Sequence, residues 1–239
     1  MKPTSRLSGL ACLSAICCLG IFLSAGCKTT PNCCWPREQT VPNASEVSDA
    51  ANRGDAKAQN DMGVVFMHSH PPDHEGAMKW YRLSADQGYA PAQHNLGMMN
   101  WRAQVPGQKY PNDVEALKWF MKAAEQNYPP SLTAIGFAYK KGRSIPQSYK
   151  EALYWFRQAA AYNEAEAEYQ LGVYYDVGHE FQANRTEAYK WFILAAAQGH
   201  CPAIKARDNI AGKLTREQIE EAQHRALVWV PKPASGGGQ

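Results

Sequence analysis

Residues 130–160 read PSLTAIGFAYKKGRSIPQSYKEALYWFRQAA, and residues 165–199 read AEAEYQLGVYYDVGHEFQANRTEAYKWFILAAAQG. Each stretch contains an apolar residue followed by glycine, and then a Trp-Phe pair whose tryptophan stands 19 residues after that glycine. Similar aromatic pairs begin earlier at Trp80 and Trp119, so the four tryptophans are spaced by 39, 36 and 36 residues. Self-similarity with a period of about 20 to 50 residues indicates an array of stacked supersecondary units.

Four glycines, each preceded by a large apolar residue, provide a second set of regular spacings. They are Gly63, Gly97, Gly136 and Gly172. From each tryptophan to the next of these glycines is 17 residues in all three cases, whereas from glycine to tryptophan within a unit the distance varies from 17 to 22. Length variation is thus confined to one connection, which predicts a loop that can grow without disturbing the stack.

Each unit has the pattern of two helices. Alanines three residues before each tryptophan, and alanine pairs four and five residues after three of them, form one stripe against which another helix can pack. Eight residues after each tryptophan comes a residue type that tolerates the left-handed end of a helix. These residues are Gly88, Asn127, Asn163 and Gly199. Glycine inside a helix costs about 1 kcal/mol relative to alanine, so the glycines of the first helices predict close backbone approach across each pair. The expected fold class is all-α, an α-solenoid (superhelix) of antiparallel helix pairs.

The same spacing divides the whole chain. A half repeat should open at the capping-box-like run Asn43-Ala44-Ser45-Glu46, and Thr215-Arg216-Glu217-Gln218 should open a closing helix. The predicted segments are a half repeat at 44–54, repeats at about 55–88, 89–127, 128–163 and 164–199, and a C-terminal cap at 200–228. Residues 27–43 are expected to be a flexible tether, because proline recurs there, and residues 229–239 a disordered tail, because proline, glycine and serine prevail there.

Two further stretches, AKAQNDMGVVF at 56–66 and APAQHNLGMMN at 90–100, complete a match to a known pattern. Together with the stretches quoted first, they resemble the Sel-one-like repeat, a relative of the tetratricopeptide repeat. The resemblance covers about residues 44–228 and departs at Asn100, where an aromatic residue is usual, and at Pro130-Ser131-Leu132-Thr133. It implies an adaptor for protein complexes, signalling or envelope processes.

The resemblance also implies a concave groove lined by the first helices. By position, that groove would present Asn60, Val64, Met67, His94, Met98, Trp101, Thr133, Phe137, Lys140, Lys141, Tyr169, Val173 and Asp176. Methionine and aromatic side chains suit a protein or peptide partner with apolar anchors, and the two lysines would meet an acidic flank. The alternative is that Val64, Met98, Phe137 and Val173 are half-buried between units.

The first 26 residues differ from the rest. Lys2 and Arg6 are their only charges, and an apolar or small-residue run follows to Leu23, as is typical of a secretory signal peptide at 1–26. The run Leu23-Ser24-Ala25-Gly26-Cys27 resembles the lipobox of bacterial lipoproteins, which implies lipidation of Cys27. The alternative is an ordinary signal-peptidase site that cuts the same bond. The expected product is an outer-membrane lipoprotein facing the periplasm or, without lipid, a periplasmic or secreted protein.

Charge and cysteine content bear on partners and compartment. Loss of the signal lowers the formal net charge from +3 to +1, so electrostatics do not favour nucleic acid as a partner. Of seven cysteines, three leave with the signal and Cys27 would be acylated. Cys33, Cys34 and Cys201 remain, and three thiols cannot all pair within one chain.

One cluster could bind a metal ion. The run His68-Ser69-His70-Pro71-Pro72-Asp73-His74-Glu75 supplies three imidazoles and two carboxylates, which suit zinc, nickel or copper. The candidate ligands are His68, His70 and His74, and an ordinary exposed loop is the alternative.

Signatures of catalysis do not occur in the sequence. GxSxG, SxxK, HExxH, GxxxxGK[ST] and CxxC are all missing. Cysteine-rich members of the resembled family bind or hydrolyse β-lactams, but they carry paired cysteines in each repeat, which this chain lacks. We therefore expect no enzyme activity and no cofactor.

Overall fold

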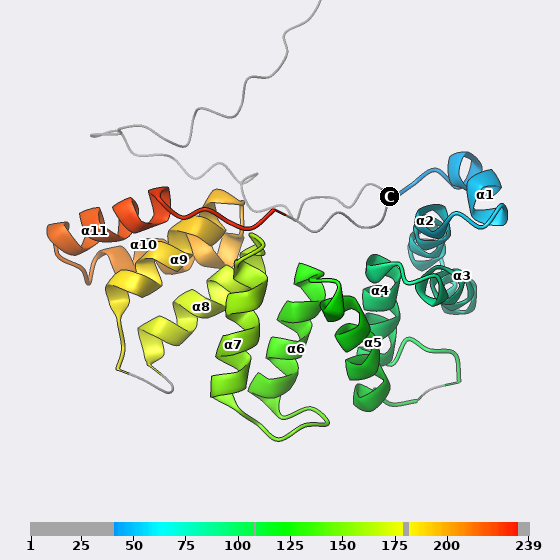
Figure 1. The fold of residues 1–239 in the computed structure, drawn as a ribbon, viewed down its shortest axis with the longest axis horizontal. Helices are drawn as coiled ribbons and strands as arrows, with labels where there is room; N and C mark the ends of the chain where they lie inside the picture. The colour runs from blue at the N-terminus through cyan, green and yellow to red at the C-terminus, as the bar shows by residue number, and fades with distance from the viewer. Residues whose placement is uncertain (1–40, 108, 179–181, 234–239) are drawn as a thin grey trace, which may run out of the picture. The chain divides into compact units, whose positions relative to one another are not determined.

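The computed structural model describes residues 41–107, 109–178 and 182–233, and within these ranges the chain forms eleven α-helices (Figure 1). In chain order they are α1 (Ala44–Asn52), α2 (Ala56–Met67), α3 (His74–Asp86), α4 (Ala90–Trp101), α5 (Asp113–Glu125), α6 (Pro129–Lys141), α7 (Tyr149–Ala160), α8 (Ala165–Val177), α9 (Arg185–Ala197), α10 (Cys201–Ala211) and α11 (Arg216–Leu227). The predicted all-α class of stacked helix pairs is confirmed. The expected signal peptide, Cys27 and the tether up to residue 40 lie outside the described residues.

Helix ends follow from local chemistry. The backbone has positive φ at each of the four residues that stand eight positions after a tryptophan, as the spacing predicts. At the starts, the side chains of Asp55, Asp73, Asn112, Ser148 and Asn184 accept hydrogen bonds from backbone N–H groups of the helices that they precede.

The two predicted capping boxes have different outcomes. Thr215 and Gln218 form one at the start of α11. Asn43 departs from the prediction: its side-chain oxygen accepts from the Ser45 N–H at 3.1 Å, and its amide donates to Glu46 at 3.3 Å. In a capping box Glu46 would instead accept from the backbone N–H of Asn43.

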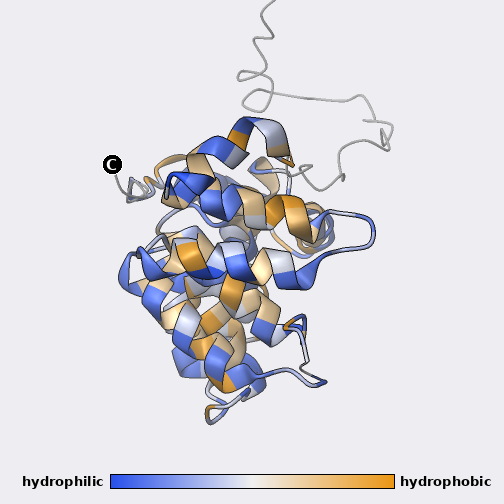
Figure 2. Cartoon of the chain, turned by 90° about the vertical axis from the view of Figure 1, so that its right-hand side faces the viewer, coloured by the Kyte–Doolittle hydropathy of each residue, from blue (hydrophilic) through white to orange (hydrophobic). Residues whose placement is uncertain are grey.

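Each first helix packs most extensively against the second helix of its own unit, in the pairs α2/α3, α4/α5, α6/α7 and α8/α9. The recurring glycines face the rings of Tyr81, Phe120, Phe156 and Phe192, and a Cβ atom added to them would lie 2.4 to 2.7 Å from a ring carbon. A buried ring therefore fills the space, which corrects the expectation of backbone against backbone. In Figure 2, hydrophilic and apolar residues alternate along the helices, as expected of amphipathic helices that pack on one side and face solvent on the other.

The C-terminal end departs from the repeat. α11 packs mainly on α9. The chain then continues as a strap, residues 229–233, in which Trp229 lies with its ring centroid 5.0 Å from that of Trp191. The Lys232 N–H donates to the carbonyl of Ala161 at 2.6 Å. These residues are thus held against α9 and the end of α7, and the predicted disordered tail is wrong for them. No helix within the described residues is long and apolar enough to cross a membrane.

Candidate partner-binding groove

The first two units share a hollow of about 570 Å³ between α2 and α4, and Tyr128, which precedes α6, is also in its lining. We call this hollow the groove. It is lined by Pro42, Asn60, Asp61, Val64, Met67, His68, Tyr81, Pro91, His94, Asn95, Met98, Met99, Arg102, Gln104 and Tyr128. Five residues predicted for a partner-binding surface lie together there. They are Asn60, Val64, Met67, His94 and Met98.

Polar side chains connect the two helices across the groove. Across the groove the Asn95 side-chain amide donates to the side-chain oxygen of Asn60 at 2.9 Å, while within α2 Lys57 pairs with Asp61 at 2.7 Å. Asn60 is buried, so its amide serves this link instead of standing free for a partner as predicted. Val64, Met67 and Met98 are half-buried and supply apolar surface beside the link.

His94 lies against two aromatic rings at the third side of the groove. Its ring centroid is 5.5 Å from that of Phe120 and 5.5 Å from that of Tyr128, and its Nδ1 lies 2.9 Å from the Ser131 hydroxyl. Burial, and then the charge of Arg102, lower the pKa of His94 to about 4. The imidazole is therefore neutral at physiological pH and acts as a hydrogen-bonding group, not as a charge.

Trp101 and Thr133, both predicted for the partner surface, are engaged within the protein. The Arg143 guanidinium lies 3.7 Å from the Trp101 ring centroid, donates to the Trp101 carbonyl at 3.2 Å and pairs with Asp113. One face of the Trp101 ring is thus covered. Thr133 is buried and donates to the carbonyl of Pro129 at 3.2 Å. Burial removes Thr133 from the predicted partner surface, whereas Trp101 is half-buried.

The predicted residues of α6 lie apart from the groove. Phe137 packs edge-on against Phe156 at 5.3 Å between ring centroids. Lys140 donates to the side-chain oxygen of Gln170 at 2.8 Å, and burial lowers the pKa of its ammonium group. Lys140 therefore links α6 to α8 by a hydrogen bond, whereas Lys141 is exposed.

The predicted residues of α8 are also separate from the groove. Tyr169 packs against His200, with ring centroids 5.0 Å apart. Val173 and Asp176 line a smaller hollow of about 160 Å³ with residues of α9 and α10, and Asp176 pairs with Arg185 at 3.6 Å. The thirteen predicted residues thus do not form one continuous surface.

Asp61, Asn95, Arg102 and Tyr128 line the groove but were missed from the sequence. Asp61 and Asn95 each directly follow a residue that was predicted, at equivalent positions of α2 and α4. Polar residues at one position of consecutive first helices were the signal that could have found them. Tyr128 precedes α6 as Tyr89 precedes α4, so the repeat register also marked it.

At one equivalent position of the first helices, the fourth unit has a buried carboxylate where the first two units have glutamine. The side-chain oxygen of Gln59 accepts from Gln87 at 2.7 Å, and that of Gln93 accepts from Gln126 at 3.0 Å. In the fourth unit Glu168 takes the same position and accepts from Gln198 at 2.7 Å. Its second oxygen is buried and, within the described part of the chain, has no hydrogen-bond partner. Burial is the main cause that raises the pKa of Glu168 to about 8, so the group is mostly protonated at neutral pH.

The three histidines considered for a metal ion do not come together. Among the described residues, no group of three or more His, Cys, Asp or Glu side chains is placed to hold a metal. His68 Nδ1 lies 2.9 Å from the carbonyl of Val64, and His70 is exposed. His74 begins α3, and its buried Nδ1 has no hydrogen-bond partner in the described ranges. The geometry does not support the predicted alternative of a metal site.

Helix pairs stacked so that each unit contacts mainly its neighbours define an α-solenoid repeat protein. The profile of the Sel1 repeat matches residues 56–89, 90–128, 129–161 and 165–200, which together are more than half of the chain. The protein therefore belongs to the Sel1 repeat family, whose repeats typically mediate protein interactions. The matched ranges lie within two residues of the unit boundaries that the spacing predicts.

Two solved structures share the fold, and a third protein shares part of the sequence. The crystal structure of c5321, a protective antigen of uropathogenic Escherichia coli with an SLR fold, has a TM-score of 0.67 and 26% identity, and the match covers 76% of this chain and 39% of that one. A Sel1 repeat protein from Oxalobacter formigenes has a TM-score of 0.60 and 24% identity over 77% of this chain and 84% of its own. A stretch of 64 residues is 31% identical to "F-box protein At1g70590" of Arabidopsis thaliana, covering 27% of this chain and 18% of the relative. The chain thus spans less than half the length of the first and third of these proteins.

Proposed function

We propose that this Sel1 repeat protein is a non-catalytic scaffold that holds an extended segment of a protein partner in the groove between α2 and α4. The observation that carries the proposal is the lining itself, in which flexible apolar side chains stand beside polar groups. Met67 and Met98 can adapt to an apolar anchor of a partner. Asn95 and neutral His94 offer hydrogen bonds close to those apolar side chains.

The location is part of the proposal. A lipid on Cys27 would hold the mature chain at the outer membrane, facing the periplasm, with residues 28–43 as its tether. The support is the run from Leu23 to Cys27 at the end of an apolar segment. The partner would then be another protein of the cell envelope.

The test compares capture of envelope proteins by the wild type and by variants. A Met67→Ala/Met98→Ala variant should lose the partner, because truncation of apolar anchors in a binding surface costs about 1 to 3 kcal/mol each. Tyr154→Ala is the matched control, since Tyr154 is exposed on α7, away from the groove. Equal recovery of one partner by the wild type and by a folded double variant would exclude the groove as the binding site.

A further inference from the structure

One second helix of this chain already has a helix docked on its outer face. α9 carries the run Glu187-Ala188-Tyr189-Lys190-Trp191, and the end of α11 and the strap cover it. Arg225 of α11 pairs with Glu187 at 3.0 Å. The Lys190 ammonium lies 4.2 Å from the ring centroid of Trp191 and 4.8 Å from that of Trp229, so it is close to both indoles. An arginine near the end of a helix, and an aromatic residue four positions later in the strap, thus seal this face.

The same motif recurs uncovered on α5, as Glu115-Ala116-Leu117-Lys118-Trp119. Lys118 pairs with Glu115 at 3.4 Å, as Lys190 pairs with Glu187 at 2.9 Å. The exposures differ: the side chains of Lys118 and Glu115 are 65% and 36% exposed, against 10% and 15% for Lys190 and Glu187. The pair on α5 therefore has the geometry of the pair on α9 without its cover.

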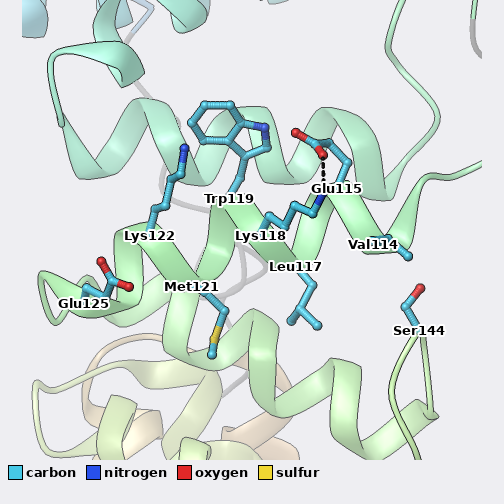
Figure 3. A pocket seen from close by; sticks show the side chains of 9 residues that line it. All are labelled: Val114, Glu115, Leu117, Lys118, Trp119, Met121, Lys122, Glu125 and Ser144. Carbon is cyan, nitrogen blue, oxygen red and sulfur yellow. Dashed lines mark hydrogen bonds and ion pairs between the residues drawn. The ribbon is translucent and has the colours of Figure 1, made fainter.

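Beside this pair lies a hollow of about 460 Å³ whose lining is mainly apolar (Figure 3). Val114 and Met121 are 55% and 42% exposed there. In Figure 3, Leu117 and Met121 point to one side of α5, while Trp119 points to the opposite side next to Lys122, whose ammonium is 4.1 Å from the ring centroid. An exposed apolar surface with charges at its rim is the usual composition of a protein interaction site.

The other second helices do not carry the motif. α3 has Gly76 at the position of the glutamate, and α7 has Tyr154 at the position of the lysine. Of the helices α3, α5, α7 and α9, therefore, only α5 shares both charged residues with α9.

We propose that the outer face of α5 docks an amphipathic helix of a partner protein that carries an arginine and, one turn later, an aromatic residue. The arginine pairs with Glu115, the aromatic side chain packs beside Lys118, and other apolar side chains of the amphipathic helix fill the hollow over Leu117 and Met121. Lys118 then lies against the incoming ring, as Lys190 lies against Trp229. The charge complementarity is that of Arg225 with Glu187. The occupant is a partner and not α11 of this chain, because Ala222 and Ala226 of α11 are buried.

The probe for the test is a fluorescein-labelled peptide of residues 216–233, which presents the arginine and tryptophan with the required spacing. It is titrated into the full mature chain carrying Cys27→Ser, and binding is followed by fluorescence anisotropy. We expect saturable binding and at least a tenfold rise in Kd with Met121→Glu or Glu115→Arg. Arg157→Glu, at the position of α7 that corresponds to Met121, is the matched control and should leave Kd unchanged. These side chains are on the surface, so circular dichroism should verify that the variants remain folded.

Charge reversal makes the test specific. A peptide with Arg225→Glu should bind weakly to the unchanged chain and regain affinity for the Glu115→Arg variant. The proposal is overturned if the peptide does not saturate, or if Glu187→Arg and not Glu115→Arg alters its binding, because the peptide would then exchange with α11 on α9. Since the groove of α2 and α4 is a different surface, its Met67→Ala/Met98→Ala variant should bind this peptide unchanged.

Discussion

Replacing Glu168 by glutamine should stabilise the protein at neutral pH, and the gain should grow until the pH passes about 8. The first two units show why, since Gln59 and Gln93 accept at this position from a glutamine at the end of the paired helix. Glu168→Gln would keep the bond from Gln198 and remove a group that must be protonated to remain neutral. The variant therefore changes the proton balance of the site without removing its hydrogen-bond acceptor.

The direction in which stability changes with pH follows from the pKa of Glu168, which rises from 4.5 to about 8 on folding. Between these values the folded chain keeps a proton that the unfolded chain has lost, so the free energy of unfolding falls as pH rises through this window. At about 1.4 kcal/mol per unit, full ionisation costs the fold on the order of 3 to 5 kcal/mol. Burial raises the pKa of Glu164 to about 7, which adds a slope of the same sign.

His94 acts in the opposite direction at lower pH. Its pKa falls from 6.5 to about 4 on folding, so it destabilises the fold as pH drops through that range and partly cancels the effect of the glutamates. The informative window is therefore from about pH 6.5, the ordinary value for histidine, to about pH 9, above the pKa of Glu168.

The assay is urea unfolding of the mature Cys27→Ser chain at these two pH values, followed by far-UV circular dichroism. The wild type should lose stability on going to the higher pH, whereas Glu168→Gln should lose much less and retain the slope due to Glu164. Glu151→Gln, at an exposed glutamate of α7, is the control and should behave like the wild type. A Glu168→Gln variant whose midpoint shifts equally at both pH values, or which is less stable at the higher pH, would refute the reasoning.

Three further perturbations test other parts of the molecule. Gly136→Ala should lower the free energy of unfolding by about 1 to 3 kcal/mol, as overpacking does, because its Cβ would meet the Phe156 ring at 2.7 Å; urea unfolding measures this, and no loss would contradict the ring-on-glycine packing. Trp229→Ala should speed hydrogen exchange in α11, because the ring ties the strap to Trp191; unchanged exchange would show that the strap does not hold the cap. Cys27→Ala should move the protein from the membrane to the soluble fraction, and a soluble wild type without an acyl group would contradict the anchor.

Much of the fold could be predicted because its determinants are local. The residues eight positions after each tryptophan have the positive φ that glycine and asparagine tolerate, and this conformation needs no knowledge of distant contacts. The strap could not be predicted in this way. Trp229 stands between a closing helix and a run of proline, glycine and serine, so composition predicted a tail. What holds Trp229 is the exposed side of α9, which only tertiary packing creates.

The candidate site was predictable only in part for the same reason. The register of the repeat correctly indicates which residues share a face, and so it brought Met67 and Met98 to one groove. The register does not indicate which residues, distant in the sequence, cover that face. Arg143 lies over Trp101 from 42 residues further along the chain, and no spacing within a unit reveals that contact.

Because the four units share one register, each unit is an internal reference for the others. Where both members of a contact are matched, as in Gln59 with Gln87, the contact is neutral and satisfied. Glu168 departs while Gln198 does not, and the result is a buried acid whose stability depends on pH. On the outer face of the second helices, the residues are matched but the packing differs. Glu115 and Lys118 of α5 correspond to the charged pair of α9, but they lack the helix that covers that pair. Differences between the units thus mark, in one case, a buried acid that must stay protonated and, in the other, an open surface that a partner can fill.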